Sequence, residues 1–246
     1  MEKRIVIFDL ETTGLHYKKG DRIIEFAGVE IIDGKKTGKS FSIRINPEGK
    51  KSDEKAFKIH GISDESLLDK KTFKQAIPEI VEFIRGAEII AHNASGFDEK
   101  FLIHEIETSG YRESLWDIVE KVTDSLVLAK AINANLSKYN LDALCKHYNI
   151  DNSARVLHGA LIDCELLADV YLAMTAGVDL TVSFDSDIPR SEIKFLNLKN
   201  PPKAIELSEE ERLENEAYLA AWEKEIKRPP MEKANQERPK VSSPKF

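Results

Sequence analysis

The sequence lacks an apolar run long enough to cross a membrane, and it has little cysteine. A transmembrane helix needs about 20 consecutive apolar residues, whereas the apolar run near the N-terminus is interrupted by Asp9. We therefore expect neither a membrane span nor a signal peptide. Both cysteines, Cys145 and Cys164, lie in patterns typical of helices, which favours buried free thiols over a disulfide or a metal site. These features suit a protein of the reducing cytoplasm.

A surplus of positive charge is also missing. The 246 residues carry 36 Lys and Arg against 43 Asp and Glu, which gives a formal net charge of −7. This balance argues against a protein that holds long duplex DNA by bulk charge. Hydrophobic residues make up 41% of the chain, which is enough for one full core with residues to spare. We expect one α/β domain followed by a tail.

What the sequence does contain is a charged strand near its start. Residues 5–14 are mostly β-branched and apolar and end in Thr-Thr-Gly, which predicts a buried strand running into a turn. Side chains alternate along a strand, so Asp9 and Glu11 emerge on one face with Cα atoms roughly 6.5 Å apart. At an effective dielectric of about 20, two carboxylates ~6 Å apart repel by roughly 3 kcal/mol. A cation such as Mg²⁺ or Mn²⁺ would compensate; alternatively, Glu11 lies past the strand end and is simply solvated.

The next stretch predicts a three-stranded antiparallel meander. Residues 22–32 and 39–45 are strand-like and flank the turn-forming residues 33–38. Residues 57–65 predict a loop, in which His60 taken alone is more typical of a surface histidine than of one that contacts a ligand. Beyond the meander, helical spacing recurs. The remaining elements expected are a helix over residues 72–86, a buried strand over 88–91, and helices beginning near residues 97, 124, 141 and 159.

The helix that begins near Phe97 carries a charge on its apolar side. Asp98 heads a row with Leu102 and Ile106 at steps of four residues, so it faces the side that the helix buries. The alternative is a role in the helix alone, because Asp in a first turn is favoured by the helix dipole and by capping.

The last helix of the domain, which extends to Met174, repeats this feature. Its apolar stripe continues backwards onto Asp163. His158 lies five residues earlier, about 140° round a regular helix, so both side chains cannot share one face of a continuous helix. We expect His158 just outside the helix, on a segment loosened by Gly159. A histidine there, beside clustered carboxylates, suits a general base.

Four carboxylates and two divalent cations balance in charge. Asp9 and Glu11 end a buried strand, and Asp98 and Asp163 open the buried faces of two helices. Such a set can hold two metal ions ~3.5–4 Å apart, which contact the attacking and leaving oxygens of an in-line phosphoryl displacement. The sequence therefore predicts a two-metal site.

The segments that contain these residues resemble the DEDDh 3′→5′ exonucleases over roughly residues 3–175. The resemblance is greatest to the proofreading branch that serves bacterial DNA polymerase III. The segments recur in order at family spacing, which makes the resemblance specific. They are Phe8-Asp9-Leu10-Glu11-Thr12-Thr13-Gly14, Ile59-His60-Gly61-Ile62, His92-Asn93-Ala94 with Phe97-Asp98, Val122-Thr123-Asp124-Ser125-Leu126, Leu141-Asp142-Ala143-Leu144-Cys145 and Leu157-His158-Gly159-Ala160-Leu161-Ile162-Asp163.

The resemblance implies a ribonuclease H-like mixed sheet flanked by helices. It also implies release of 3′-terminal deoxynucleoside monophosphates from single-stranded or frayed DNA, two bound Mg²⁺ or Mn²⁺ ions, and a bacterial cytoplasm. The implied metal ligands are Asp9, Glu11, Asp98 and Asp163, the implied general base is His158, and the implied nucleotide pocket comprises Asp9, Glu11, Thr12, Thr13, His60, Asn93 and Asp163.

Two positions depart from the family pattern. Ser95-Gly96 adds one residue before Phe97-Asp98, and Lys55 stands where such relatives can have Glu. The approach to Asp98 and one substrate contact are expected to differ accordingly.

Beyond the domain the composition shifts. We expect a linker over residues 176–202, an amphipathic helix within 203–228, and a disordered tail over 229–246. Residues 179–184 occupy the position of a sliding-clamp segment but lack its leading Gln. The resemblance implies that the helix docks on the polymerase alpha subunit, and Trp222 is the anchor we expect.

Other readings remain open on sequence alone. The Asp-x-Glu-x-Thr pattern after the first strand is weakly similar to haloacid-dehalogenase phosphatases, but that scheme needs a second Asp at Glu11 and leaves Asp98 and Asp163 without a role. A polymerase-stabilising scaffold with a weak site is a second alternative. A DEDDh exonuclease that acts on RNA or in repair is a third.

Overall fold

The computed structural model describes residues 3–153, 155 and 159–176, which contain one six-stranded sheet. Its order is β4-β3-β2-β1-β5-β6, with β1, β2 and β3 antiparallel and with β5 and β6 parallel to β1. This is the ribonuclease H-like mixed sheet that the resemblance implied. The strands are β1 (Arg4–Thr12), β2 (Ile23–Ile32), β3 (Lys35–Asn46), β4 (Lys71–Thr72), β5 (Glu88–Ala91) and β6 (Lys121–Asp124).

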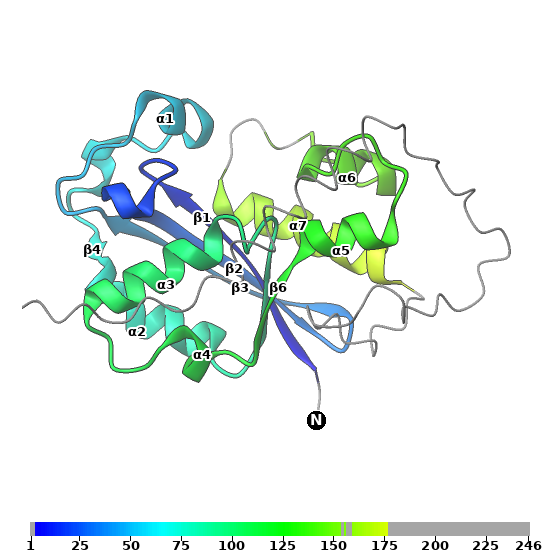
Figure 1. Cartoon of the computed structure of the whole chain (residues 1–246), viewed down its shortest axis with the longest axis horizontal. Helices are drawn as coiled ribbons and strands as arrows, with labels where there is room; N and C mark the ends of the chain where they lie inside the picture. The colour runs from blue at the N-terminus through cyan, green and yellow to red at the C-terminus, as the bar shows by residue number, and fades with distance from the viewer. Residues whose placement is uncertain (1–2, 154, 156–158, 177–246) are drawn as a thin grey trace, which may run out of the picture. The chain divides into compact units, whose positions relative to one another are not determined.

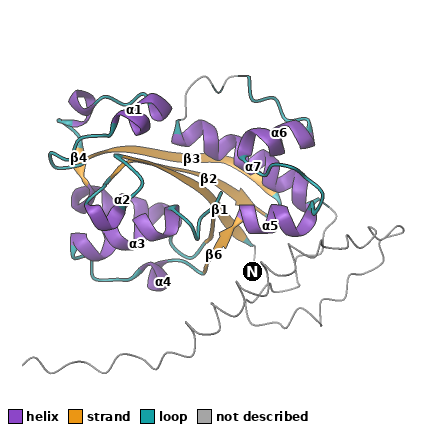
Figure 2. Cartoon of the chain, turned by 45° about the horizontal axis from the view of Figure 1, so that its top comes forward, coloured by secondary structure: helices purple, strands orange, loops and turns teal. Residues whose placement is uncertain are grey.

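Two layers of helices cover the sheet. In the views of Figure 1 and Figure 2, α5, α6 and α7 lie on one side of it, and α2, α3 and α4 lie on the other. Within the described residues, the α-helices are α1 (Glu54–His60), α2 (Phe73–Ile84), α3 (Asp98–Ser109), α4 (Leu115–Ile118), α5 (Ser125–Ile132), α6 (Leu141–Tyr148) and α7 (Ala160–Thr175).

The central strand β1 is buried on both faces. Val6, Phe8 and Leu10 pack in the core on the side of α2 and α3, whereas Ile5 and Ile7 pack on the side of α7. Burial on both faces explains why the sequence is apolar without a break over these positions. Because side chains alternate, Asp9 and Glu11 continue the face of Ile5 and Ile7, so both carboxylates point to the side that α7 covers.

The meander is confirmed, and the turn within it has a clear cause. Asp33 and Gly34 connect β2 to β3 with φ values of 48° and 73°. A two-residue hairpin with positive φ at both positions matches the right-handed twist of the strands. β3 therefore begins directly after the turn at Lys35, four residues earlier than the sequence pattern indicated.

Several short elements differ from expectation. Residues 54–60 form helix α1, closed by Gly61 at a φ of 68°, where we expected a loop from residue 57. β4 and β6 were not expected as strands, because they span only two and four residues and lack a sustained apolar alternation. The short helix α4 was also missed. By contrast, the expected helix near residue 124 is confirmed, and Asp124 caps it by accepting from the backbone N–H of Leu126.

Cys145 and Cys164 are buried free thiols, as expected. The helices that the structure describes are all too short or too polar to cross a membrane.

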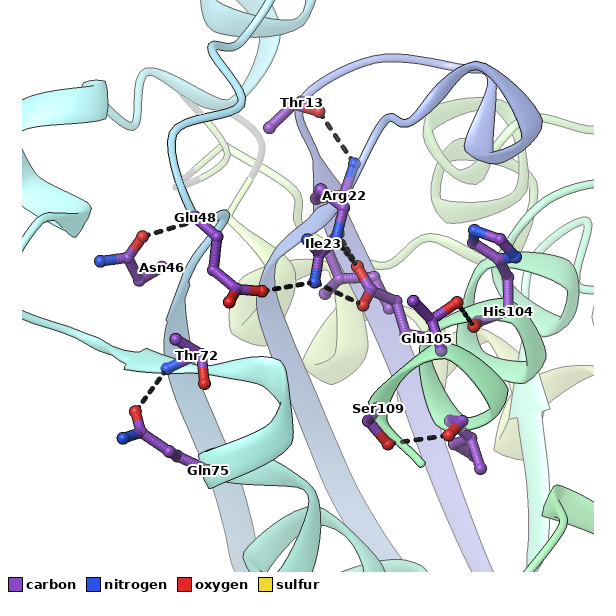
Figure 3. A network of polar contacts seen from close by, with 12 residues as sticks. Thr13, Arg22, Ile23, Asn46, Glu48, Thr72, Gln75, His104, Glu105 and Ser109 are labelled. Atoms are coloured by element: carbon purple, nitrogen blue, oxygen red, sulfur yellow. Dashed lines mark hydrogen bonds and ion pairs between the residues drawn. The ribbon is translucent and has the colours of Figure 1, made fainter. Parts of the chain in front are cut away.

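A buried ion pair joins α3 to the start of β2. Arg22 Nε donates to Glu105 Oε1 at 2.7 Å, and its Nη2 donates to Oε2 at 3.0 Å (Figure 3). The Glu105 side chain is only 1% exposed and also accepts from the backbone N–H of Ile23 at 3.2 Å. Arg22 reaches Glu48 as well, at 3.1 Å. The pair fixes the position of the helix that begins with Asp98.

We expect Arg22→Gln to lower the free energy of unfolding by about 3 kcal/mol, because it leaves the Glu105 carboxylate buried without its charged partner. Urea denaturation followed by circular dichroism measures this loss. The matched control is Arg85→Gln, which breaks an equally bidentate but exposed pair with Glu113. A loss in the control as large as that of Arg22→Gln would show that burial is not the cause.

Candidate active site

Three carboxylates meet where β1 ends. Asp9 and Glu11 come from β1 and Asp163 comes from the first turn of α7, and one oxygen of each lies within 4.8 Å of the others. The contact between α7 and both β1 and β2 brings these sequence-distant residues together. Cys164, next to Asp163, is buried in the same interface and its thiol donates to the Ala27 carbonyl at 3.4 Å.

A fourth carboxylate, Asp98, approaches from α3. The pairing of β1 with β5 ends at Ile7 and Ile90, so the last residues of β1 have room for another partner on that side. Asp98 is 3% exposed, and the backbone of Leu10 lowers the pKa of its carboxyl against the larger effect of burial. Asp98 also acts electrostatically on Asp9. All four carboxylates named from the sequence therefore lie around the end of one strand.

Burial and mutual repulsion raise the pKa of several of these groups. The pKa of Asp9 is raised well above its ordinary value, first by burial and then by Asp98, Glu11 and Asp163. Burial, followed by Asp163 and Glu25, raises the pKa of Glu11 to about 8. Burial chiefly raises the pKa of Asp98 to about 7. The cluster thus holds negative charge only at a cost, which a cation would remove.

Sequence analysis missed one cation in the site, Arg155. Its Nε donates to Asp163 Oδ1 at 2.5 Å and its Nη2 donates to Asp163 Oδ2 at 2.7 Å. Its Nη1 donates to Asp142 at 2.9 Å. Arg155 also lowers the pKa of both Asp9 and Glu11, against the larger effect of burial. A single arginine in a loop carries no periodic signal, so the sequence pattern gave no reason to select it.

The donor set fits a hard divalent cation. The clustered atoms are carboxylate oxygens, which Mg²⁺ and Mn²⁺ prefer, and the raised pKa values show that positive charge is needed there. The guanidinium on Asp163 shows that the cluster attracts a cation. Asp9, Glu11 and Asp163 could hold such an ion directly, and Asp98 is placed to complete the set.

Residues of the expected nucleotide pocket lie close to the end of β1 or on segments attached to it. The Thr12 hydroxyl donates to the Gly14 carbonyl at 2.7 Å, and the Thr13 hydroxyl accepts from the Arg22 N–H at 2.9 Å. These bonds shape the turn after Glu11. The backbone N–H of Asp53, which precedes α1, donates to the Thr13 carbonyl at 2.8 Å and so attaches α1 to this turn.

His60 and Asn93 differ in exposure. His60 is 5% exposed, so it is not the surface histidine that its loop position alone favoured. Its Nδ1 accepts from the Ile62 N–H at 2.9 Å, its Nε2 is buried without a hydrogen-bond partner among the described residues, and burial lowers its pKa. Asn93 is exposed, with a φ of 66°. His158 lies outside the described residues; α7 begins at Ala160, with Gly159 as its N-cap.

A cavity of about 440 Å³ opens beside β5. His92 stands in its wall, and the Ser125 Oγ lies 3.0 Å from its Nδ1. Arg155, which bonds Asp163, also acts electrostatically on His92. The cavity therefore adjoins the carboxylates. Its lining is His92, Asn93, Leu126, Lys130, Ser137, Lys138, Tyr139 and Asn140.

Known proteins are similar to this chain in sequence. Residues 6–171 match the family model described as Exonuclease. The DNA polymerase III subunit epsilon of Escherichia coli K12 is 44% identical over 179 residues, which cover 71% of this chain and 72% of that protein. The subunit epsilon of Rickettsia prowazekii is 45% identical over 205 residues, with 82% and 88% covered.

Solved exonuclease structures share the fold. A structure of exonuclease X in complex with 5′ overhanging duplex DNA has a TM-score of 0.52 at 25% identity and covers 70% of this chain and 91% of that one. A complex of E. coli exonuclease I with single-stranded DNA has a TM-score of 0.61 at 19% identity, covering 72% of this chain and 41% of that one.

The raised carboxyl pKa values predict how pH affects the metal-free protein. Glu11 binds its proton more tightly in the folded than in the unfolded chain, so its contribution to stability is lost as pH rises towards about 8. Between pH 6.5 and 8 in EDTA, we expect stability to fall by up to ~1.4 kcal/mol per pH unit for each proton that the folded chain still holds and the unfolded chain has lost. Calorimetric melting measures this trend.

The control is Glu11→Gln, which removes one titrating group. Its stability should therefore fall less steeply with pH than that of the wild type. A melting temperature that stays constant or rises with pH in the wild type would contradict the raised pKa of the cluster.

Proposed function

This chain belongs to the exonuclease family, and on that premise we propose that it removes nucleotides from the 3′ end of single-stranded or frayed DNA. Family membership makes it a metal-dependent exonuclease. Its relatedness to epsilon subunits supports a proofreading role beside a bacterial DNA polymerase III. The observation that carries the proposal is the convergence of buried carboxylates at the end of β1.

The four carboxylates would hold two Mg²⁺ or Mn²⁺ ions. When bound, such ions neutralise the cluster and supply Lewis-acid stabilisation of the phosphoryl oxygens. The residues of this chain supply fixed geometry. β1 sets the spacing of Asp9 and Glu11, α3 positions Asp98 against the Leu10 backbone, and α7 brings Asp163 over the same face. Rigid elements therefore carry every ligand, which favours a single productive arrangement.

We assign the general base to His158. It precedes α7 by one residue, the N-cap Gly159, so it stands in sequence beside the turn that carries Asp163. A neutral imidazole at this place can take a proton from the attacking water. Activity should therefore fall as pH drops below roughly 6.5, the reference pKa of histidine, shifted by the surrounding carboxylates.

The terminal nucleotide would lie against the turn after β1. Thr12 and Thr13 form that turn, Asn93 extends from the end of β5, and the buried Nε2 of His60 is available as a hydrogen-bonding group. A mispaired end unpairs at lower cost than a matched one. Preference for mismatches can thus follow from fraying, without recognition of the base itself.

The preceding nucleotides would follow the cavity beside β5. Lys130 and Lys138 line it, and the wall contains Asn93 of the proposed terminal pocket. Two lysines next to an acidic centre are suited to backbone phosphates, which carry the charge in nucleic-acid binding. Local charge of this kind suits a short strand end, in agreement with the negative net charge of the whole chain.

The tail assignments stay proposals, since residues 177–246 lie outside the described part of the structure. We propose a linker over 176–202, a helical segment over 203–228 that docks on the alpha subunit, a sliding-clamp segment at 179–184, and a disordered end over 229–246. The domain over residues 1–175 would act in the cytoplasm.

The test is release of nucleotides from a 5′-labelled primer with a matched or mismatched 3′ end, in Mg²⁺ or EDTA. We expect metal-dependent shortening that is faster at the mismatch. His158→Gln should lower the rate about 10²- to 10⁴-fold, as expected when a general base is removed, and Asp9→Asn should lower it at least as much. The matched control is Glu88→Gln, which removes a buried carboxylate that bonds Thr123 at the opposite end of β1 from the cluster.

The results of this nuclease assay distinguish the alternative functions. Shortening of RNA but not of DNA would favour an RNA-processing exonuclease. No shortening of either in Mg²⁺ or Mn²⁺ would favour a polymerase-stabilising scaffold. Activity that survives Asp9→Asn would remove the carboxylate site from the mechanism.

The cavity gives a separate prediction. Lys130→Ala/Lys138→Ala should raise KM for a single-stranded oligonucleotide several-fold with little change in kcat, because the lysines touch only the phosphates upstream. The slope of log KM against log salt should fall by about 0.7 for each phosphate that a lysine no longer neutralises. Steady-state kinetics over a range of salt checks this. Lys70→Ala/Lys71→Ala, at the opposite edge of the sheet near β4, is the matched control; an equal effect there would assign the change to net charge.

A further inference from the structure

Arg155 contacts one of the carboxylates that could hold a metal ion. Its guanidinium bonds both oxygens of Asp163 in a bidentate pair, at 2.5 and 2.7 Å. Asp163 offers an oxygen to the three-carboxylate cluster. The guanidinium therefore uses the same atoms that a divalent ion would need.

The surroundings favour an exchangeable contact. Arg155 also bonds Asp142 at 2.9 Å, and the Asp142 side chain is 57% exposed. Asp142 belongs to α6 and lies outside the cluster. The guanidinium therefore has a second carboxylate partner that a metal ion in the cluster would not bind. The Arg155 side chain itself is 9% exposed and contributes positive charge to Asp9 and Glu11.

We propose that Arg155 is a built-in cation that occupies the carboxylate site of the metal-free protein and is displaced from Asp163 when a divalent metal ion binds. The inference rests on the proposed metal role of Asp163. Before metal binds, the guanidinium offsets part of the repulsion among the carboxylates and keeps Asp163 oriented. When the metal takes Asp163, Arg155 keeps Asp142 and releases the cluster.

Two cations that compete for one carboxylate are linked thermodynamically. Each must weaken the binding of the other by the same factor. Removal of the arginine should thus strengthen metal binding while it destabilises the metal-free fold. A purely structural arginine would instead stabilise both forms, and its removal would leave metal affinity unchanged or weaker.

The experiment must separate the effect of the positive charge of Arg155 from its competition with the metal ion for the oxygens of Asp163. Arg155→Gln removes the charge and the bidentate fork, whereas Arg155→Lys keeps the charge and removes the fork. Arg4→Gln is the matched control, because it removes a half-buried arginine from its pair with the buried carboxylate of Glu30 at the opposite end of β1 from the cluster.

The experiment measures Mn²⁺ binding to the full chain by calorimetry, without DNA, together with the melting temperature in EDTA. We expect Arg155→Gln to bind Mn²⁺ at least about fivefold more tightly than the wild type, Arg155→Lys to lie between them, and both to melt lower in EDTA. Arg4→Gln should melt lower with unchanged Mn²⁺ affinity. In the wild type, saturating Mg²⁺ should speed hydrogen exchange of the Arg155 Nε–H, followed by NMR.

Four results would overturn the inference. Unchanged or weaker Mn²⁺ binding by Arg155→Gln would assign Arg155 a structural role. Wild-type affinity in Arg155→Lys, or an Nε–H whose exchange does not respond to Mg²⁺, would show that the arginine acts by charge and stays in place. If the wild type binds no Mn²⁺, the proposed metal site fails as well, so that failure is distinct from the other three.

Discussion

Repulsion among carboxylates at the end of β1 is the constraint on which the rest of the structure depends. Asp9 and Glu11 follow apolar residues that pack on the same face of the sheet, so the site is built on the end of the core and not on a mobile loop. Burial raises the cost of charge there, and a cation is the way to lower that cost without separating the groups. The need for a compensating cation is thus a property of the fold in the absence of any substrate.

Sequence could predict the parts of the site that sit on periodic elements. Asp9 and Glu11 interrupt an apolar strand, and Asp163 interrupts the apolar stripe of a helix, so each was visible as a charge where burial was expected. Such interruptions cost free energy, and a sequence retains them where something compensates. The mixed sheet and the main helices followed from the same periodicity together with the family resemblance.

The parts that could not be predicted depend on contacts between distant segments. Arg155 is an isolated charge in a loop, and its part in the site becomes evident only from its hydrogen bond to Asp163. β4 and β6 exist because a neighbouring strand offers hydrogen bonds to short, mixed sequences. The buried state of His60 depends on α1, whose first turn is held by the backbone of Thr13. Local patterns carry none of this information.

Two arginines in this protein make the same bidentate contact and differ in what competes for it. Arg22 holds Glu105, which also accepts from a backbone N–H, so the pair fixes one helix on the sheet. Arg155 holds Asp163, whose oxygens face other carboxylates. The bond geometry is alike, yet only the second carboxylate lies where a divalent ion gains from several oxygens at once. Whether a buried ion pair persists is therefore decided by the groups around its carboxylate and not by the geometry of the pair.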